Sequence, residues 1–222
     1  RTPGNIVAIR PMKDGVIADF DVTQAMLKYF IRKAMRSKSF VRPRVVVGVP
    51  SGVTEVEKRA VIDAAQQAGA REAYLVEEPM AAAIGAGLPV EEATGSMVVD
   101  IGGGTTEIAV ISLGGIVSNK SIRIAGDDLT ADIMEYMRRQ HNMKVGESTA
   151  ERIKINVGAV LTSLDNPPED YVVHGPNQMT ALPMEVPISY QEIAHCLDKS
   201  ISKMEAAILS ALEQTPPELY AD

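Results

Sequence analysis

Cysteine, tryptophan and basic charge are scarce in this 222-residue chain, and each shortage narrows what the protein can be. The single cysteine, Cys196, excludes an internal disulfide and a cysteine-based metal site, and it is typical of the reducing cytoplasm, where we expect the protein to act. The formal net charge of −7 argues against nucleic-acid binding, which usually needs a basic excess. The longest apolar runs, such as residues 45–49, are far too short to span a bilayer.

Two common nucleotide-binding motifs are also missing. No Gly-Lys-Ser/Thr sequence follows a glycine-rich segment, so there is no P-loop, and there is no Rossmann glycine fingerprint. The three histidines, His141, His174 and His195, are scattered along the chain, which predicts no zinc site. A phosphate site would therefore need a different glycine motif.

Three consecutive glycines, residues 102–104, lie between two β-branched runs in the stretch 98–110. The flanks predict strands, and the glycines predict either an ordinary tight hairpin or a turn that something approaches closely. We favour a phosphate-holding hairpin, because three glycines are more than a two-residue turn needs. Main-chain N–H groups and the hydroxyls of Thr105 and Thr106 would hold the phosphate, and Asp100 would hold a hydrated divalent cation.

The order of the expected elements indicates an α/β protein. The run 45–49 is apolar and β-branched, as in a buried central strand, and the strand–helix–strand–helix order around it implies a mostly parallel sheet. Capping patterns predict helix starts at Asp21 with Gln24, Thr54 with Glu57, Ser148 with Glu151, and Ser189 with Glu192. We expect helices over 22–36, 54–68, 79–85, 129–140, from Ser148 and from Ser189 to 212, and strands over 6–9, 16–19, 45–49, 74–76, 171–174 and 184–188, with a three-stranded antiparallel meander over 97–124.

The loop 37–44 carries two apolar residues, Phe40 and Val41, among basic residues. In one interpretation these two side chains pack into the core and the bases are solvated. In the other, the apolar tip inserts into a membrane surface while the basic residues contact anionic headgroups. The residues alone favour packing into the core. The basic residues are Arg36, Lys38, Arg42 and Arg44.

Two pairs of charged residues have both a structural and a functional interpretation. Glu77 and Glu78 stand between a strand and a helix, where the helix dipole stabilises an acid, and one of them could position a water for attack on a phosphoryl group. Glu151 is explained by its capping pattern and Lys154 by helix solvation, whereas a functional interpretation has them bracket a ribose. The residues alone leave both interpretations open.

Three segments follow one another in the order used by the actin-like ATPase superfamily, which includes actins, heat-shock chaperone ATPases and sugar kinases. They are residues 78–85 (EPMAAAIG), 99–106 (VDIGGGTT) and Gly126-Asp127. Within that superfamily the chain resembles the MreB family of bacterial actins over essentially all its length, including residues 10–19 (RPMKDGVIAD), Gly48-Val49-Pro50 and 149–154 (TAERIK). The resemblance implies an α/β, actin-like (ribonuclease H-like) ATPase fold with mixed sheets flanked by helices, incomplete in this chain.

The resemblance also implies roles for individual residues. The glycine hairpin would be the second phosphate loop of an ATP site, with Asp100 near Mg²⁺ through a water, and Glu78 and Thr105 would arrange the hydrolytic water. Phe40 and Val41 match the hydrophobic membrane-insertion loop of the family, which reverses the interpretation favoured above. The implied nucleotide-binding residues are Asp100, Gly102, Gly103, Gly104, Thr105, Thr106, Glu151, Arg152, Ile153 and Lys154.

For the whole protein, the resemblance implies an ATP-driven filament subunit that organises cell-wall synthesis and so sets rod shape. The implied partners are the filament itself, the cytoplasmic face of the inner membrane and the cell-wall elongation machinery. A chaperone-type ATPase domain and a sugar kinase are the alternatives, but neither a peptide-binding domain nor a sugar-directed base is visible. The implied subdomains are IB (1–20), IA (21–92), the first part of IIA (93–128), IIB (129–192) and the start of the second part of IIA (193–222).

The MreB-like pattern is incomplete in this chain. A first phosphate loop of Asp-Leu-Gly-Thr type and a glycine-rich adenine-side motif, both typical of the family, are missing, and the chain does not begin with Met. We therefore expect an internal fragment that keeps one of two phosphate clamps. ATPase activity is expected of the full-length protein, whereas the 222 residues alone should bind ATP weakly or not at all, which isothermal titration would test.

Overall fold

The computed structural model describes residues 7–13, 16–35 and 41–219, which form two compact units. Unit 1 contains Arg1–Asp100, Thr105–Arg123 and Ser210–Asp222, and unit 2 contains Ile101–Gly104 and Ile124–Leu209. Both units combine helices with strands, so the α/β class is confirmed. The finer subdomain boundaries implied by the resemblance stay a prediction.

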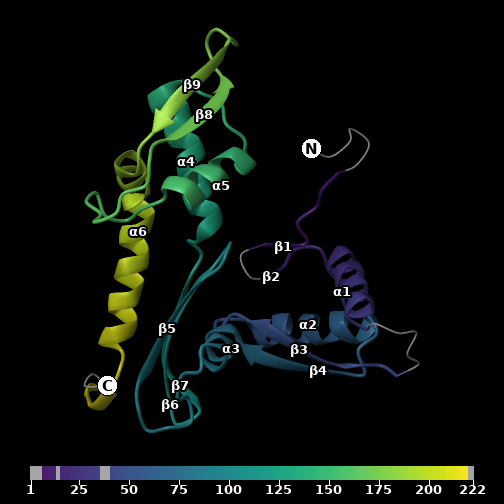
Figure 1. Cartoon of the computed structure of the whole chain (residues 1–222). Helices are drawn as coiled ribbons and strands as arrows, with labels where there is room; N and C mark the ends of the chain where they lie inside the picture. The colour runs from purple at the N-terminus through teal and green to yellow at the C-terminus, as the bar shows by residue number, and fades with distance from the viewer. Residues whose placement is uncertain (1–6, 14–15, 36–40, 220–222) are drawn as a thin grey trace. The chain divides into compact units, whose positions relative to one another are not determined.

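In unit 1, strands β3 (Arg44–Val49) and β4 (Glu72–Glu77) pair in parallel, and helix α2 (Glu55–Gln67) is the crossover between them. α2 packs against both strands, and α1 (Phe20–Ala34) packs against α2 (Figure 1). The strand–helix–strand order predicted from the sequence is confirmed. This arrangement brings the start of helix α3 (Glu78–Gly85) directly to the carboxyl end of β4.

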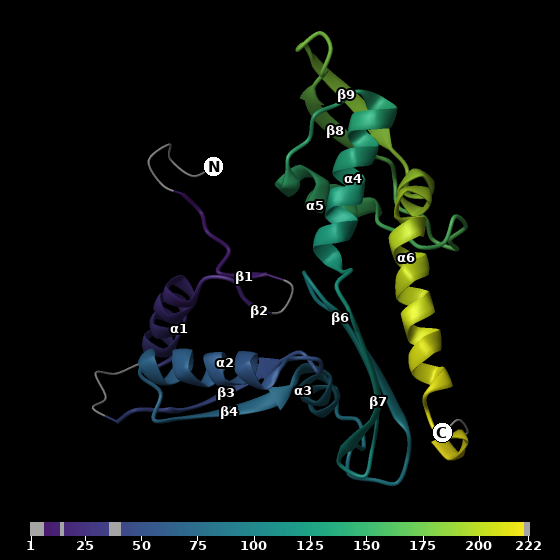
Figure 2. The same ribbon diagram turned by 180° about the vertical axis from the view of Figure 1, so that it is seen from behind.

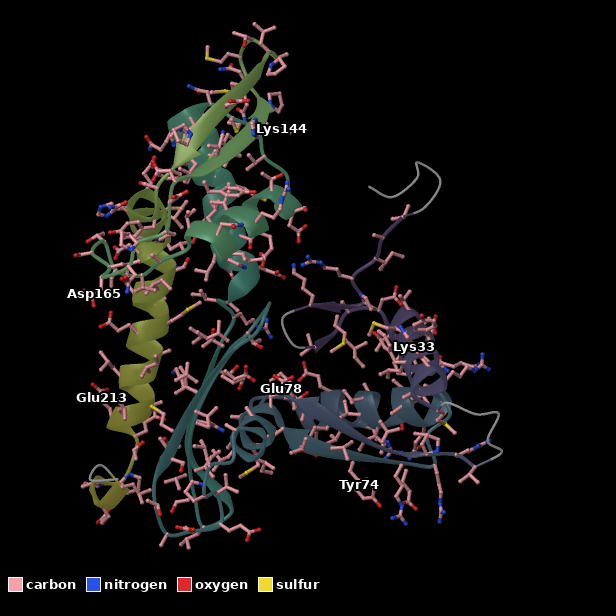
Figure 3. All side chains as sticks on the ribbon, viewed as in Figure 1. Lys33, Tyr74, Glu78, Lys144, Asp165 and Glu213 are labelled. Carbon is pink, nitrogen blue, oxygen red and sulfur yellow. The ribbon has the colours of Figure 1, made fainter. Side chains whose placement is uncertain are left out.

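The prediction that β3 is a buried central strand is wrong for this two-stranded sheet. Exposure alternates along the strand, so that Val46 is 67% exposed whereas Val49 is buried. Tyr74 of β4 pairs in register with Val46 and is also exposed, and Figure 3 shows its side chain on the face turned away from α2. A β-branched run favours a strand, but burial of the whole run requires cover on both faces of the sheet.

A second sheet in unit 1 has the strand order β5-β6-β7, which confirms the predicted three-stranded meander (Figure 1; β6 and β7 are labelled from behind in Figure 2). Its strands are β5 (Ser96–Ile101), β6 (Thr106–Ser112) and β7 (Gly115–Ile122), and every residue of the middle strand is buried. The β6–β7 turn uses Leu113 and Gly114 with φ values of 52° and 74°, as a two-residue antiparallel hairpin requires. The β5–β6 connection contains the three glycines.

In unit 2, three helices and one hairpin enclose an apolar core (Figure 1). The helices are α4 (Gly126–His141), α5 (Glu147–Val157) and most of α6 (Tyr190–Glu213), and the antiparallel hairpin joins β8 (Tyr171–Pro176) to β9 (Pro183–Ile188). The largest buried side chains of this core are Ile133, Met137, Met143, Ile153, Val173, Ile188 and Ile193. In unit 1 the chain ends its described part with the short helix η1 (Pro217–Leu219).

Two of the four predicted helix caps are confirmed. Before α2, the Glu57 N–H donates to the Thr54 hydroxyl at 3.3 Å, and the Glu57 carboxylate accepts the Thr54 N–H at 2.7 Å. Before α6, Ser189 and Glu192 make the same reciprocal pair at 3.3 and 3.0 Å. Both caps depend on residues three apart, so the local sequence is enough to specify them.

The other two predicted caps are wrong in position. Asp19 rather than Asp21 caps α1, since its carboxylate accepts a backbone N–H of the first turn at 3.0 Å. Gly146 precedes α5, so Ser148 lies inside that helix. Helix α4 also begins earlier than expected, at Gly126 instead of residue 129.

The N-terminal strand pair also differs from its prediction. Residues 7–9, the described part of the run expected as a strand over 6–9, are not in a strand. The observed antiparallel pair is β1 (Met12–Lys13) with β2 (Val16–Ile17), so its first strand begins after the run expected for it.

Replacing Ile153 by alanine should destabilise unit 2 by about 2–5 kcal/mol, because its side chain is fully buried in the core. Ile155, two residues along the same helix, is 72% exposed and gives a matched control. Ile155→Ala should change stability by less than ~0.5 kcal/mol. Urea unfolding followed by circular dichroism measures both, and equal effects would contradict the assignment of the core.

Candidate functional site

The glycine turn packs against the start of α4 within unit 2. The Gly102 carbonyl accepts the Gly126 N–H at 3.0 Å, and the Gly103 carbonyl accepts the Asp127 N–H at 2.8 Å. A Cβ added to Gly126 would lie 3.1 Å from the Gly102 oxygen, which is too close for an unstrained contact. Gly126 is therefore required by this close backbone approach, which holds the glycine turn at a helix N-terminus.

Two predicted nucleoside contacts, Glu151 and Lys154, meet around the same helix start. The Lys154 ammonium donates to the Gly126 carbonyl at 3.0 Å and lies 2.7 Å from the Glu151 carboxylate. Lys154 and the hydroxyl of Thr130, through their hydrogen bonds, lower the pKa of Glu151. We name Gly126, Thr130, Glu151 and Lys154 the α4 cluster.

Thr130 was missed by the sequence analysis. Its hydroxyl lies 2.9 Å from the Gly126 carbonyl, 2.7 Å from Glu151 and 3.0 Å from the Lys154 ammonium. A threonine four residues after a helix start can bond that first carbonyl, which was the available signal. Its contacts with α5 depend on packing and had no local signal.

The other two predicted residues of α5 do not join the α4 cluster. The Ile153 side chain is fully buried in the core of unit 2. Arg152 is exposed and donates a long 3.5 Å hydrogen bond to the hydroxyl of Thr149. The side chain of Ile153 is thus accounted for by packing, and a nucleoside role for either residue stays a prediction.

Glu78, the predicted water-positioning acid, is the first residue of α3 in unit 1 and is labelled in Figure 3. Its side chain lies against Gly48 of β3, where an added Cβ would be 3.4 Å from the Glu78 Cγ. Burial, followed by the negative charges of Glu107 and Asp100, raises the pKa of the Glu78 carboxyl. Two other carboxylates of unit 1, those of Glu107 and Asp100, therefore act electrostatically on Glu78.

Glu107 is the second functional candidate that the sequence analysis missed. It is 2% exposed in the middle strand β6, and its carboxylate accepts the Ser51 N–H at 3.3 Å and the Ser121 hydroxyl at 2.5 Å. A charged residue inside an apolar strand needs polar partners, which was the available signal. Its partners are 56 and 14 residues away in sequence, so they could not be named in advance.

The two threonines after the glycines are buried in unit 1. Thr105 lines a cavity of about 250 Å³ in which hydroxyl, carboxylate and guanidinium groups meet. The cavity is lined by Val16, Pro50, Gly52, Val53, Glu57, Thr105, Ser121 and Arg123. It gives Thr105 a polar surrounding, although it does not test the predicted catalytic role.

The residues of unit 1 fit a phosphate and a hydrated cation. Ser51 has a buried hydroxyl with no hydrogen-bond partner among the described residues, so it is available to a bound water or oxygen anion. Across the described ranges, no three His, Cys, Asp or Glu side chains gather closely enough to hold a metal directly. A cation near Asp100 would therefore keep several of its waters, as Mg²⁺ usually does.

The predicted membrane contact is described in part. Val41 is 69% exposed, so it does not pack into the core as one interpretation had it. Phe40 lies outside the described residues. Nearby, the Arg44 guanidinium pairs with Glu72 at 3.1 Å. Within the described ranges, no helix is long and apolar enough to cross a membrane.

The glycine turn and the sheets around it define an actin-like fold. The solved structure of MreB 5 of Spiroplasma citri bound to AMPPNP matches this chain with a TM-score of 0.91 and 37% sequence identity. The match covers all of this chain and 66% of that one. The chain belongs to the MreB/Mbl protein family, because the family model matches residues 1–222.

Curated relatives agree with this family. The cell shape-determining protein MreB of Escherichia coli K12 is 54% identical over 224 residues, and Mbl of Bacillus subtilis 168 is 47% identical over 222 residues. Both comparisons cover all of this chain. The chain spans 64% of the first relative and 66% of the second.

Proposed function

We propose that the full-length protein containing this chain is an ATP-dependent, actin-like filament subunit that determines cell shape. The observation that carries the proposal is the match of all 222 residues to a family with relatives named as cell shape-determining proteins. A similar structure was solved with AMPPNP, which supports a nucleotide ligand. Family membership favours this function over a chaperone-type ATPase domain or a sugar kinase.

In unit 1, Glu78 and Thr105 would orient the water that attacks the terminal phosphate. Glu78 suits this role because its carboxylate is partly desolvated and lies near two other acids, which makes it a better hydrogen-bond acceptor. Asp100 would hold Mg²⁺ through water, and the bound ion would neutralise charge on the phosphate oxygens. Positioning and electrostatics are what phosphoryl transfer requires of a protein.

In unit 2, the glycine turn and the α4 cluster would serve the phosphate and nucleoside parts of the ligand. The backbone contacts at Gly126 and Asp127 fix the turn, so its N–H groups are organised before a ligand arrives. Glu151 and Lys154 are already held by Thr130 and Gly126. We therefore assign them a supporting role for the start of α4 together with any contact to a ribose.

The filament would act at the cytoplasmic face of the inner membrane and organise the cell-wall elongation machinery. Electron microscopy of the full-length protein on lipid vesicles tests this proposal. Filaments on the vesicle surface should form with ATP and be absent without nucleotide. Monomers under both conditions would contradict the proposal.

Replacing Phe40 and Val41 together by serine in the full-length protein should abolish most vesicle binding. The exposure of Val41 and the basic residues beside it favour an anionic lipid surface. Ile155→Ser removes a similarly exposed apolar residue from α5 and should leave binding intact. Co-sedimentation with vesicles of anionic and of neutral lipid measures the effect, and undiminished binding of the double variant would remove the membrane role of this loop.

A further inference from the structure

Glu107 joins the β6–β7 strand pair, in which Ser121 is its cross-strand partner, to the loop after β3. It lies on β6, its Oε2 accepts the Ser51 N–H in the loop after β3, and its Oε1 accepts the hydroxyl of Ser121 on β7. It also stands two residues after Thr105, which shares a cavity lining with Pro50, Gly52 and Ser121. The carboxylate is thus the common hydrogen-bond acceptor for the segments around Thr105.

Both oxygens of the buried Glu107 carboxylate accept a hydrogen bond, which accounts for an acid at this position. Taking a carboxylate out of water is costly, even when hydrogen bonds compensate part of the loss. A glutamine of the same shape would offer one acceptor oxygen instead of two, so only a carboxylate accepts from both donors in this geometry. Its negative charge is a second property, which acts on neighbouring groups.

The charge acts on Glu78. Among the causes that raise the pKa of the Glu78 carboxyl, the negative charge of Glu107 follows burial and precedes that of Asp100. Glu107 on β6 and Asp100 on β5 are thus the two acids whose charges act on Glu78. Repulsion from them makes the Glu78 carboxylate more basic and so a stronger acceptor from a water.

We propose that Glu107 is a positioning residue for ATP hydrolysis, which holds the Pro50–Gly52 loop beside Thr105 and acts on Glu78 through its negative charge. This inference rests on the proposed ATPase function. It assigns Glu107 no contact with the nucleotide. Glu107 also holds the backbone N–H of Ser51, the residue whose buried hydroxyl has no hydrogen-bond partner among the described residues.

Three variants of the full-length protein separate charge from geometry. Glu107→Gln keeps the shape, removes the charge and replaces one acceptor oxygen by an NH2 group. Ser121→Ala keeps the charge and removes one hydrogen bond, and Glu107→Asp keeps the charge on a shorter stem. Glu91→Gln, at an exposed position of the same unit, is the matched control for loss of an acid. The readouts are kcat, the ATP KM and the pH dependence of kcat.

Glu107→Gln should lower kcat roughly 10-fold, as loss of a supporting partner commonly does, while KM changes little. The acidic limb of its pH profile should move to lower pH, because Glu78 no longer ionises against a neighbouring charge. Ser121→Ala should lower kcat without moving that limb, Glu107→Asp should recover the limb position, and Glu91→Gln should match the wild type.

Wild-type turnover is measured first, and its absence would overturn the proposed function itself. If the wild type hydrolyses ATP and Glu107→Gln keeps both its kcat and its pH profile, the role of Glu107 alone is overturned. If Glu107→Gln does not fold, Ser121→Ala and Glu107→Asp decide. Unchanged kcat in Ser121→Ala would then overturn the role of Glu107. So would an acidic limb of the Glu107→Asp pH profile that does not return to its wild-type position.

Discussion

Replacing Glu78 by glutamine in the full-length protein should slow ATP hydrolysis roughly 10²–10⁴-fold, the usual range for a positioned acid or base. ATP affinity should change little, because the glutamine keeps the shape of the side chain beside Gly48. Glu77, its neighbour, is the matched control, since it makes no side-chain capping bond. Glu77→Gln should keep near wild-type turnover. Equal turnover in Glu78→Gln and wild type, measured by phosphate release, would assign the catalytic role elsewhere.

The same variant should melt at a higher temperature than the wild type at pH 7. The pKa of the Glu78 carboxyl is raised above its ordinary value of 4.5, so the folded state is penalised once that group ionises above its raised pKa. Well below pH 4.5 the carboxyl is protonated in both folded and unfolded states, and the difference should disappear. A slower but more stable variant would exclude misfolding as the cause of lost activity.

Replacing Gly126 by valine should weaken ATP binding by the full-length protein at least ~10-fold, a loss of about 1.4 kcal/mol. Its Cβ would lie 3.1 Å from the Gly102 carbonyl and 3.5 Å from the Lys154 ammonium, so the glycine turn must move. The hydrogen bond between the Gly126 N–H and Gly102 would be strained or lost.

Gly146→Ala is the matched control, because an added Cβ there meets nothing within 4 Å and φ is −87°. Fluorescent-nucleotide titration measures both variants. Wild-type affinity in Gly126→Val, with the fold intact by circular dichroism, would show that the turn does not depend on this contact.

Features specified by neighbouring residues were predicted from the sequence, and those specified by distant residues were not. The caps at Thr54 and Ser189 needed only a partner three positions away. At α1 the cap is Asp19 instead of Asp21, and the Thr23 hydroxyl donates to the carbonyls of Asp19 at 2.6 Å and Pro11 at 3.3 Å. Composition around a cap cannot rank two such candidates.

The site followed the same rule. The three glycines predicted a turn with special backbone geometry. The functional roles of Glu78 and of the α5 residues came from the family resemblance. The hydrogen bonds that Glu107 accepts were not predicted, because their donors lie in the loop after β3 and on β7. Thr130 was missed because its link to Glu151 crosses from α4 to α5. The burial of β3 was overestimated because its side-chain pattern carries no information on what covers each face.

The central claim is that ATP bound by these residues drives assembly of the filament. Polymer mass and phosphate release, recorded together in one sample of the full-length protein, test it most directly. We expect polymer to appear after ATP is added, with phosphate release following, and both to be reduced for Gly126→Val at an ATP concentration near the wild-type Kd. The same amount of polymer without nucleotide as with ATP would contradict the account.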